Sequence, residues 1–324
     1  VLAKFETTLQ MILATQQEDT ETTRSLQEAC TMGFPLYDTS NPPKVAGRLR
    51  VELAEECRLS DQRTGPACYA KVYENSNDDP SINCVSAFPI PMAAPFTFED
   101  YINDGWRLEL NVAIDFTSSN GDPRIPGTLH DMNATTLNDY EETIVSIATA
   151  LTPYSVDQSL ETAVWGFGCK FDNVVRHIFQ CGSEPRVCGV GGILQAYKSV
   201  FASDLTMSGP TCFDQVIQAA AVRAHKHQQT HQKLYSVLLI ITDGICQNLE
   251  ETQRKLDTYN ICPLSTIIVG VGRADFSELH RLDSLSKVVM CEFRQHQHDP
   301  NSMGNYALEA LQAQFVQYCT SLTE

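Results

Sequence analysis

The sequence predicts an α/β protein with a doubly wound, mostly parallel sheet, preceded by a shorter segment with a β pattern. Apolar runs of strand length occur at 108–115, 235–241 and 264–271, and each is followed by a helix-like segment. Apolar runs without polar alternation are typical of strands that are buried on both faces of a parallel sheet. Strands that alternate with helices in this way form such a sheet, with helices packed on both faces.

The N-terminal region has a different pattern. Residues 3–8 and 47–53 alternate between apolar and polar side chains, which predicts two strands. We therefore expect a partial β domain at 1–58. Residues 59–96 contain a turn cluster and several prolines, which predicts a linker or insertion.

The α/β domain is expected at 97–324. The segment at 136–152, which follows the first predicted strand of this domain, places Tyr140, Ile144, Ile147 and Leu151 on one face. A helix that packs on a sheet requires such an apolar face. The elements that the pattern predicts are, in chain order, a short helix at 97–103, a strand at 108–115, a helix at 136–152, strands at 164–168 and 177–180, helices at 191–201 and 212–226, a strand at 235–241, a helix at 249–258, strands at 264–271 and 288–293, and a helix at 305–321.

Composition limits the possible classes of function. The 324 residues are 43% hydrophobic and 19% charged, as in a globular protein, and no apolar run is long enough for a transmembrane helix. The net charge of −17 argues against nucleic acid, whose affinity comes largely from Lys and Arg on phosphates. Twelve scattered cysteines without a CxxC pair favour free thiols in a reducing, intracellular protein; the alternative is a secreted protein with disulfides. The chain lacks an initiator Met, so we expect it to be part of a longer protein.

Oxygen-bearing side chains follow three of the predicted elements. Asp115 ends the first apolar run and is followed by Thr117 and Ser119; Thr211 stands at the start of a predicted helix; Asp243 follows the strongest strand. Because the carboxyl ends of parallel strands lie at one edge of the sheet, these five side chains can converge. Carboxylates and hydroxyls suit Mg²⁺, and also Mn²⁺ or Ca²⁺, better than zinc. The sequence therefore predicts a metal site there.

Other interpretations remain open for these residues. Asp115 and Asp243 could be turn or helix-capping residues without a metal. Asp115 with Ser119 could imitate a hydrolase or phosphatase site, but no general base is evident, and no GxSxG or HExxH motif occurs. The glycines at 189–192 lack the Lys-Ser/Thr of a phosphate loop, so helix entry is favoured.

Histidines form two small groups. His225, His227 and His231 include a spacing of four that can bind zinc, but their polar neighbours favour a solvated helix end. His296 and His298 are expected in a loop.

The metal-site residues carry a resemblance to a known family. Asp115-Phe116-Thr117-Ser118-Ser119 resembles the DxSxS signature of von Willebrand factor A domains, and Thr211 and Asp243 match the two other metal-site positions of that family. Further motifs, in order, resemble copines. They are Phe98-Glu99-Asp100-Tyr101-Ile102, the run from Val112 to Pro123, Gly192-Ile193-Leu194-Gln195-Ala196-Tyr197, Ser208-Gly209-Pro210-Thr211, Ile241-Thr242-Asp243-Gly244, and the run from Ile268 to Phe276. The sequence departs from the copine pattern in a short stretch at 283–288, an insertion at 59–94, and His130-Asp131-Met132-Asn133 in place of an aromatic, proline-rich region.

The resemblance implies a function. Copines carry two C2 domains before the A domain, and residues 1–8 and 47–53 resemble strands of the second, so the Ca²⁺-binding loops would lie upstream of this chain. It implies a non-enzymatic protein-binding module with a metal-ion-dependent adhesion-type site that takes an acidic side chain of a partner. The whole protein would be cytoplasmic and would bind membrane phospholipid when calcium is present, recruiting or scaffolding other proteins. The alternative is a structural component of a large cytoskeletal or ciliary assembly with the metal site unused.

Overall fold

The chain divides into two compact units, Val1–Pro95 and Phe96–Glu324. The computed structural model describes residues 96–244, 246–299 and 301–322 in full, and the backbone of four strands between residues 34 and 89.

The first unit contains a four-stranded antiparallel sheet in the order β1-β2-β3-β4. The strands are β1 (Phe34–Tyr37), β2 (Val45–Glu56), β3 (Ala67–Asn75) and β4 (Asn83–Pro89). The predicted strand at 47–53 lies within β2, whereas the one at 3–8 lies outside the described residues. Two of these strands, β3 and β4, lie within the range 59–96 and pair with each other, and the assignment of that range as a linker or insertion stays a prediction. Assignment of this sheet to a C2-like domain stays a prediction.

The second unit is built on a mixed sheet in the order β10-β6-β5-β12-β13-β14, with β9 also paired to β6. Five strands are mutually parallel; two short ones run antiparallel along β6. The strands are β5 (Arg107–Asp115), β6 (Glu161–Phe167), β9 (Phe179–Gln180), β10 (Val187–Cys188), β12 (Leu234–Thr242), β13 (Leu264–Gly270) and β14 (Val288–Glu292). This topology confirms the predicted doubly wound, mostly parallel α/β class.

The order of the parallel strands creates a switch point beside β5. The chain first passes from β5 to β6 on one side, and then continues with β12 on the other side of β5. In open α/β sheets, ligands bind outside the carboxyl ends of the strands where the order reverses in this way. The carboxyl ends of β5 and β12 therefore mark the expected ligand position.

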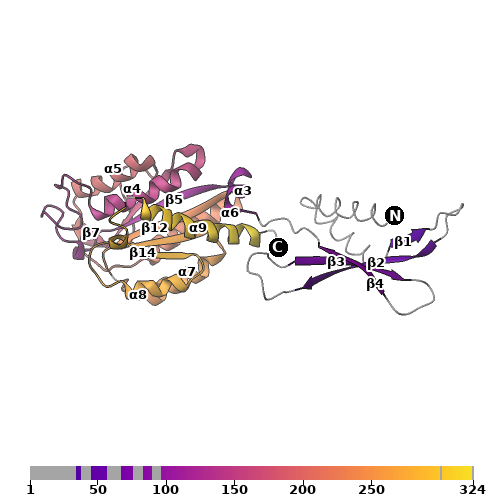
Figure 1. The fold of residues 1–324 in the computed structure, drawn as a ribbon. Helices are drawn as coiled ribbons and strands as arrows, with labels where there is room; N and C mark the ends of the chain where they lie inside the picture. Colours follow the sequence, from indigo (N-terminus) through magenta and orange to yellow (C-terminus); the bar gives the residue numbers. More distant parts are fainter. Residues whose placement is uncertain are drawn as a thin grey trace. The chain divides into compact units, whose positions relative to one another are not determined.

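Helices cover both faces of this sheet (Figure 1). One face packs against α3 (Phe98–Asn103), α4 (Asp139–Leu151), α5 (Gly189–Ser199) and α9 (Ser302–Ser321). The other packs against α6 (Asp214–Gln229), α7 (Leu249–Thr258) and α8 (Ser277–His280). Side chains alternate between the two cores along β5, so that Val112 joins the first core and Ala113 the second. No helix within the described ranges has the length and apolar character needed to cross a bilayer.

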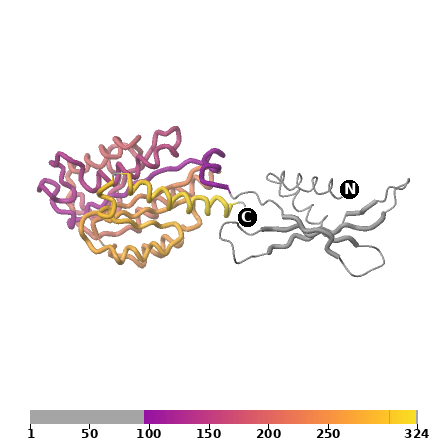
Figure 2. Tube along the Cα trace, in the orientation of Figure 1, coloured from indigo at the N-terminus to yellow at the C-terminus, as the bar shows by residue number. Residues whose placement is uncertain are grey.

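The first and last helices of this unit pack together. Phe315 of α9 contacts the ring of Phe98 edge-on at 5.2 Å and that of Tyr101 at 5.8 Å, both on α3. Figure 2 follows α3 (indigo) and the end of α9 (yellow) to the same end of the unit. Edge-to-face aromatic pairs add to the burial of their apolar area, so these contacts fix the start of the unit to its end.

A small antiparallel sheet lies next to the switch point. It consists of β7 (Cys169–Phe171), β8 (Val174–Arg176) and β11 (Thr206–Met207), in the order β11-β7-β8. The residue after β11, Ser208, donates its N–H to the carbonyl of Gly168 at 3.1 Å. This sheet therefore positions the loop that leads to α6.

Candidate metal centre

The five residues predicted to bind a metal occupy loops at one edge of the sheet. Asp115 is the last residue of β5 and is fully buried, with Thr117 and Ser119 in the loop that follows. Thr211 lies just before α6, and Asp243 follows β12 directly. The two acids thus end the two strands at the switch point.

Hydroxyl groups of the first loop contact Asp243. The Oγ of Ser119 donates to Oδ1 of Asp243 at 2.9 Å, and the Oγ1 of Thr117 lies 3.5 Å from the same oxygen. The two hydroxyls also lie 2.9 Å from each other. The structure therefore brings together three of the five residues, although 124 residues separate Ser119 from Asp243.

Both carboxylate oxygens of Asp115 are held. Oδ1 accepts the N–H of Thr117 at 2.8 Å, and Oδ2 accepts the hydroxyl of Thr242 at 2.6 Å. One donor comes from the following loop and the other from the neighbouring strand β12. The carboxylate is thus fixed in orientation before it meets any ligand.

Backbone hydrogen bonds tie the Thr211 loop to both other loops. The Thr211 carbonyl accepts the N–H of Gln247, in the segment after Asp243, at 2.9 Å. Three residues before Thr211, the Ser208 carbonyl accepts the N–H of Ser118 at 2.7 Å. Within the described part of the chain, no hydrogen bond joins the Thr211 hydroxyl to the other four residues, so its place beside them rests on these backbone links.

The electrostatics of the two acids favour a cation. Burial, together with the nearby charge of Asp243, raises the pKa of Asp115 to about 7, against the hydrogen bonds from Thr117 and Thr242. Burial also raises the pKa of Asp243, against the hydrogen bonds from Ser119 and Thr117. None of the ion pairs formed by the described residues involves either acid. Two buried like charges without a counter-charge are costly, and a bound cation would remove that cost.

A buried histidine contacts the backbone carbonyl of Asp115, and the sequence analysis did not identify it as part of the site. The Nε2 of His130 lies 2.9 Å from the Asp115 carbonyl, and its Nδ1 lies 2.7 Å from the Tyr197 hydroxyl. Since a carbonyl can only accept, Nε2 carries the proton and Nδ1 accepts from Tyr197. Burial lowers the pKa of His130 to about 3, so the ring is neutral. The only signal in the sequence was that His130 replaces the aromatic pattern of copines.

A second buried chain of contacts supports the loop after β5. Tyr140 of α4 stacks on His130 with ring centroids 4.2 Å apart and donates its hydroxyl to Oδ1 of Asn120 at 2.7 Å. The Nδ2 of Asn120 in turn donates to the Thr117 carbonyl at 3.1 Å. Outer hydrogen bonds of this kind orient the ligands of metal sites.

Gly168 permits the close approach of Thr117. Its φ of +77° is a conformation that side chains rarely adopt, and a Cβ at this position would overlap the Cγ2 of Thr117. The turn after β6 is therefore matched to the shape of the candidate site.

The donor set fits a hard cation and not zinc. Within the described ranges, no group of three or more His, Cys, Asp or Glu side chains is arranged to hold a metal. Two carboxylates with neighbouring hydroxyls instead match a cation that keeps part of its water shell, as Mg²⁺ does. Binding by the five named residues stays a prediction.

The histidines on α6 do not form a metal site. The prediction of a solvated helix end is wrong for His227, whose side chain is 13% exposed and whose Nε2 lies 3.0 Å from Glu109 Oε2. Its Nδ1 lies 2.8 Å from Gln232 Oε1. The sequence could not reveal this, because Glu109 lies 118 residues away along the chain. His225 and His231 are exposed.

Comparison with known proteins identifies curated relatives of this chain. The chain is 41% identical over 192 residues to "Protein BONZAI 2" of Arabidopsis thaliana, covering 58% of this chain and 32% of that protein. It is 36% identical over 208 residues to "Nicotinic receptor-associated protein 1" of Caenorhabditis elegans, covering 63% and 32%. The solved VWA domain of SpRpn10 is 12% identical with a TM-score of 0.41, covering 63% of this chain and 95% of that domain; a likeness at this level carries no functional information.

The matched region is the second unit. The chain spans about a third of the length of the curated relatives that it matches. The family model described as Copine matches residues 128–319, more than half of the chain. The chain therefore belongs to the copine family.

Proposed function

We propose that the second unit is a non-enzymatic protein-binding module that uses a divalent cation at the switch point. Mg²⁺ is the preferred ion, with Mn²⁺ or Ca²⁺ as substitutes. Thr117 or Ser119 and Thr211 would bind it directly, and Asp115 and Asp243 directly or through water. An acidic side chain of a partner would complete the coordination shell.

The observation that carries this proposal is the pair of buried acids without a counter-charge. Asp115 and Asp243 end adjacent strands, and hydroxyls from another loop already point at Asp243. Binding rather than catalysis is proposed because the Ser119 hydroxyl donates to Asp243 and, among the described residues, no histidine contacts it as a general base. Copine membership supports a role in protein interaction.

We also propose how the complete protein acts. One relative is named for association with a nicotinic receptor, which favours protein partners for this chain also. We propose that the complete protein is cytoplasmic and reaches membrane phospholipid through Ca²⁺-binding C2 loops upstream of this chain. The module would then bring its partner to the membrane.

Calorimetric titration tests the cation site. Mg²⁺ added to the metal-free chain should release or absorb heat in the wild type and not in Asp243→Ala. Asp122→Ala is the matched control, because Asp122 is an acid of the same loop region that pairs with exposed Arg124 instead. Equal heats in the wild type and Asp243→Ala would refute the site.

A second experiment tests the partner. Proteins captured from a lysate by the wild type in Mg²⁺ should be lost with chelator and with Asp243→Ala. Identical partners in all three conditions would contradict metal-mediated binding and favour a structural role with the metal site unused.

A further inference from the structure

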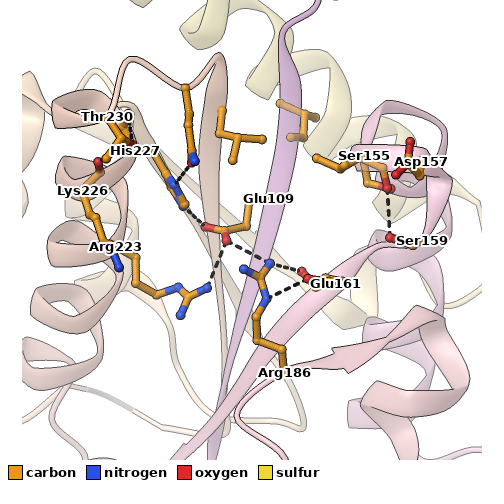
Figure 3. A pocket seen from close by; sticks show the side chains of 14 residues that line it. Glu109, Ser155, Asp157, Ser159, Glu161, Arg186, Arg223, Lys226, His227 and Thr230 are labelled. Atoms are coloured by element: carbon orange, nitrogen blue, oxygen red, sulfur yellow. Dashed lines mark hydrogen bonds and ion pairs between the residues drawn. The ribbon is translucent and has the colours of Figure 1, made fainter.

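A cavity of about 500 Å³ opens at the amino edge of the sheet, opposite the candidate metal centre. It lies between the first residues of β5, β6 and β12 and the last turns of α6. Figure 3 shows Glu109 at its centre, with Arg186, Arg223 and His227 directed toward it. Val156 and Leu234 line the cavity as apolar groups.

Glu109 is a buried carboxylate held by three basic side chains. Its Oε1 lies 3.0 Å from an Nη2 of Arg186 and 3.0 Å from an Nη2 of Arg223. Its Oε2 lies 3.0 Å from His227 Nε2 and accepts the Ser236 hydroxyl at 3.1 Å. The side chain is 3% exposed, so Glu109 is an internal counter-ion and has no room to bind a cation from solution.

The cluster carries more positive than negative charge. His227 lies between two oxygen acceptors, Glu109 and Gln232, and the hydrogen bond to Glu109 raises the pKa of its ring. Three basic side chains thus surround one carboxylate. At the rim, the positive charge of exposed Lys226 is counted against the negative charges of Asp157 and Glu161. Glu161 also pairs with Arg186, with 3.4 Å between Oε2 and Nε. With His227 protonated, the lining carries one more positive than negative charge, in a chain whose net charge is −17.

The Arg223 side chain is 28% exposed, and one of its donors lacks a partner within the described ranges. The Nε of Arg223 is buried and has no hydrogen-bond partner among the described residues. Buried donors are nearly always paired with protein, water or a ligand. Lys226 lines the same cavity about one helical turn from Arg223 and forms none of the ion pairs found in the described part of the chain.

We propose that this cavity binds a small phosphate-bearing organic anion. Arg223 and Lys226 would donate to the phosphate. Arg186 and His227 would neutralise Glu109, so that its charge repels the phosphate less. A phosphate accepts from several charged donors at once, whereas a single carboxylate would only duplicate Glu109. Val156 and Leu234 would contact the organic part, and the volume is within the range of ligand pockets. This proposal is independent of the metal centre.

Calorimetry without divalent cations tests the proposal with two probes, inorganic phosphate and phenyl phosphate, on the whole chain. Both should bind, and phenyl phosphate should bind more tightly because its ring meets the apolar wall. Arg223→Gln should weaken binding by about tenfold or more, the loss of one strong charged contact. Lys226→Gln, an exposed position, should weaken binding severalfold without lowering the melting temperature. Arg254→Gln, at an exposed position on α7 where the side chain pairs with Glu251, is the matched control and should bind as the wild type.

Glu109→Gln separates a ligand site from a purely structural cluster. Removing the internal counter-ion leaves the arginines without their competitor, so phosphate should bind several times more tightly than to the wild type. A structural cluster would show only lower stability and no gain in binding. The proposal is overturned if neither probe binds the wild type, or if Lys226→Gln and Arg223→Gln both bind as Arg254→Gln does.

Discussion

The hydroxyl of Thr242 donates a 2.6 Å hydrogen bond to Oδ2 of Asp115, so the last residue of β12 orients the carboxylate that ends β5. This contact joins two adjacent parallel strands at the switch point and is buried. The candidate metal centre therefore depends on the register of two strands as well as on its own five residues.

Thr242→Val removes this donor while keeping the shape of the side chain. We expect a loss of about 2 kcal/mol in the free energy of unfolding, since a buried carboxylate oxygen is left unpaired. Mg²⁺ affinity should fall by about tenfold or more, because the outer contact that orients the carboxylate is lost. Urea unfolding and Mg²⁺ titration measure the two effects. Thr266→Val on β13, a buried threonine at the other end of the sheet, should leave Mg²⁺ affinity unchanged.

Asp243→Asn should change stability in opposite directions with and without metal. The metal-free variant should be more stable than the wild type by about 1 kcal/mol, because one of two buried like charges is removed. With Mg²⁺ at about 100 times its dissociation constant, the wild type should gain about 2.7 kcal/mol and the variant almost nothing. Thermal melts in chelator and in Mg²⁺ give the comparison. A metal-free variant that is clearly less stable would contradict repulsion between the two acids.

Gly168→Ala should displace Thr117. The variant adds a Cβ that overlaps the Thr117 methyl and forces a positive φ on a non-glycine residue, which together should cost about 2 kcal/mol or more. Gly105→Ala is the matched control: its φ is +96°, but a Cβ there meets nothing within 4 Å, so it reports the backbone cost alone. Mg²⁺ affinity should drop in Gly168→Ala and not in Gly105→Ala. Equal affinities would show that the turn after β6 does not shape the site.

The Glu109–His227 contact should give a pH-dependent contribution to stability. Burial alone would raise the pKa of Glu109, but His227, Arg223 and Arg186 together hold it at about 2. The hydrogen bond to Glu109 raises the pKa of His227 against the effect of burial. The Glu109 contribution is present above about pH 4.5 and lost as the pH falls toward 2, whereas that of His227 is present below about 6.5 and lost as the pH rises through its folded value.

His227→Gln tests this dependence. The stability advantage of the wild type over the variant should be greatest at about pH 5.5 and should shrink by about 1 kcal/mol or more at alkaline pH, when the imidazolium deprotonates. Urea unfolding at both pH values, in buffer without phosphate, measures it. An advantage that is constant between the two values would mean that His227 is not protonated in the folded protein.

Local patterns predicted most of the α/β unit. The apolar runs that became β5, β12 and β13 are each fixed by burial on both faces, so strand type and position followed from composition alone. The parallel direction of these strands also followed from the sequence, because strands that are joined through helices rarely lie antiparallel in the same sheet. The strands β3 and β4 within the range 59–96 were not predicted, since turn residues mark the ends of paired strands as well as unstructured connections.

For the site, the sequence by itself determined that Asp115, Thr117, Ser119, Thr211 and Asp243 lie at strand or helix ends on one edge of a parallel sheet, since chain direction and burial decide that. Only the tertiary structure decided which buried side chains support these residues and which cluster forms at the opposite edge of the sheet. The neutral His130 under the Asp115 carbonyl, the Thr242 hydroxyl on its carboxylate, and the basic cluster around Glu109 join residues far apart in sequence. Such contacts leave no periodic signal, because each depends on side-chain direction and on the distance between packed elements.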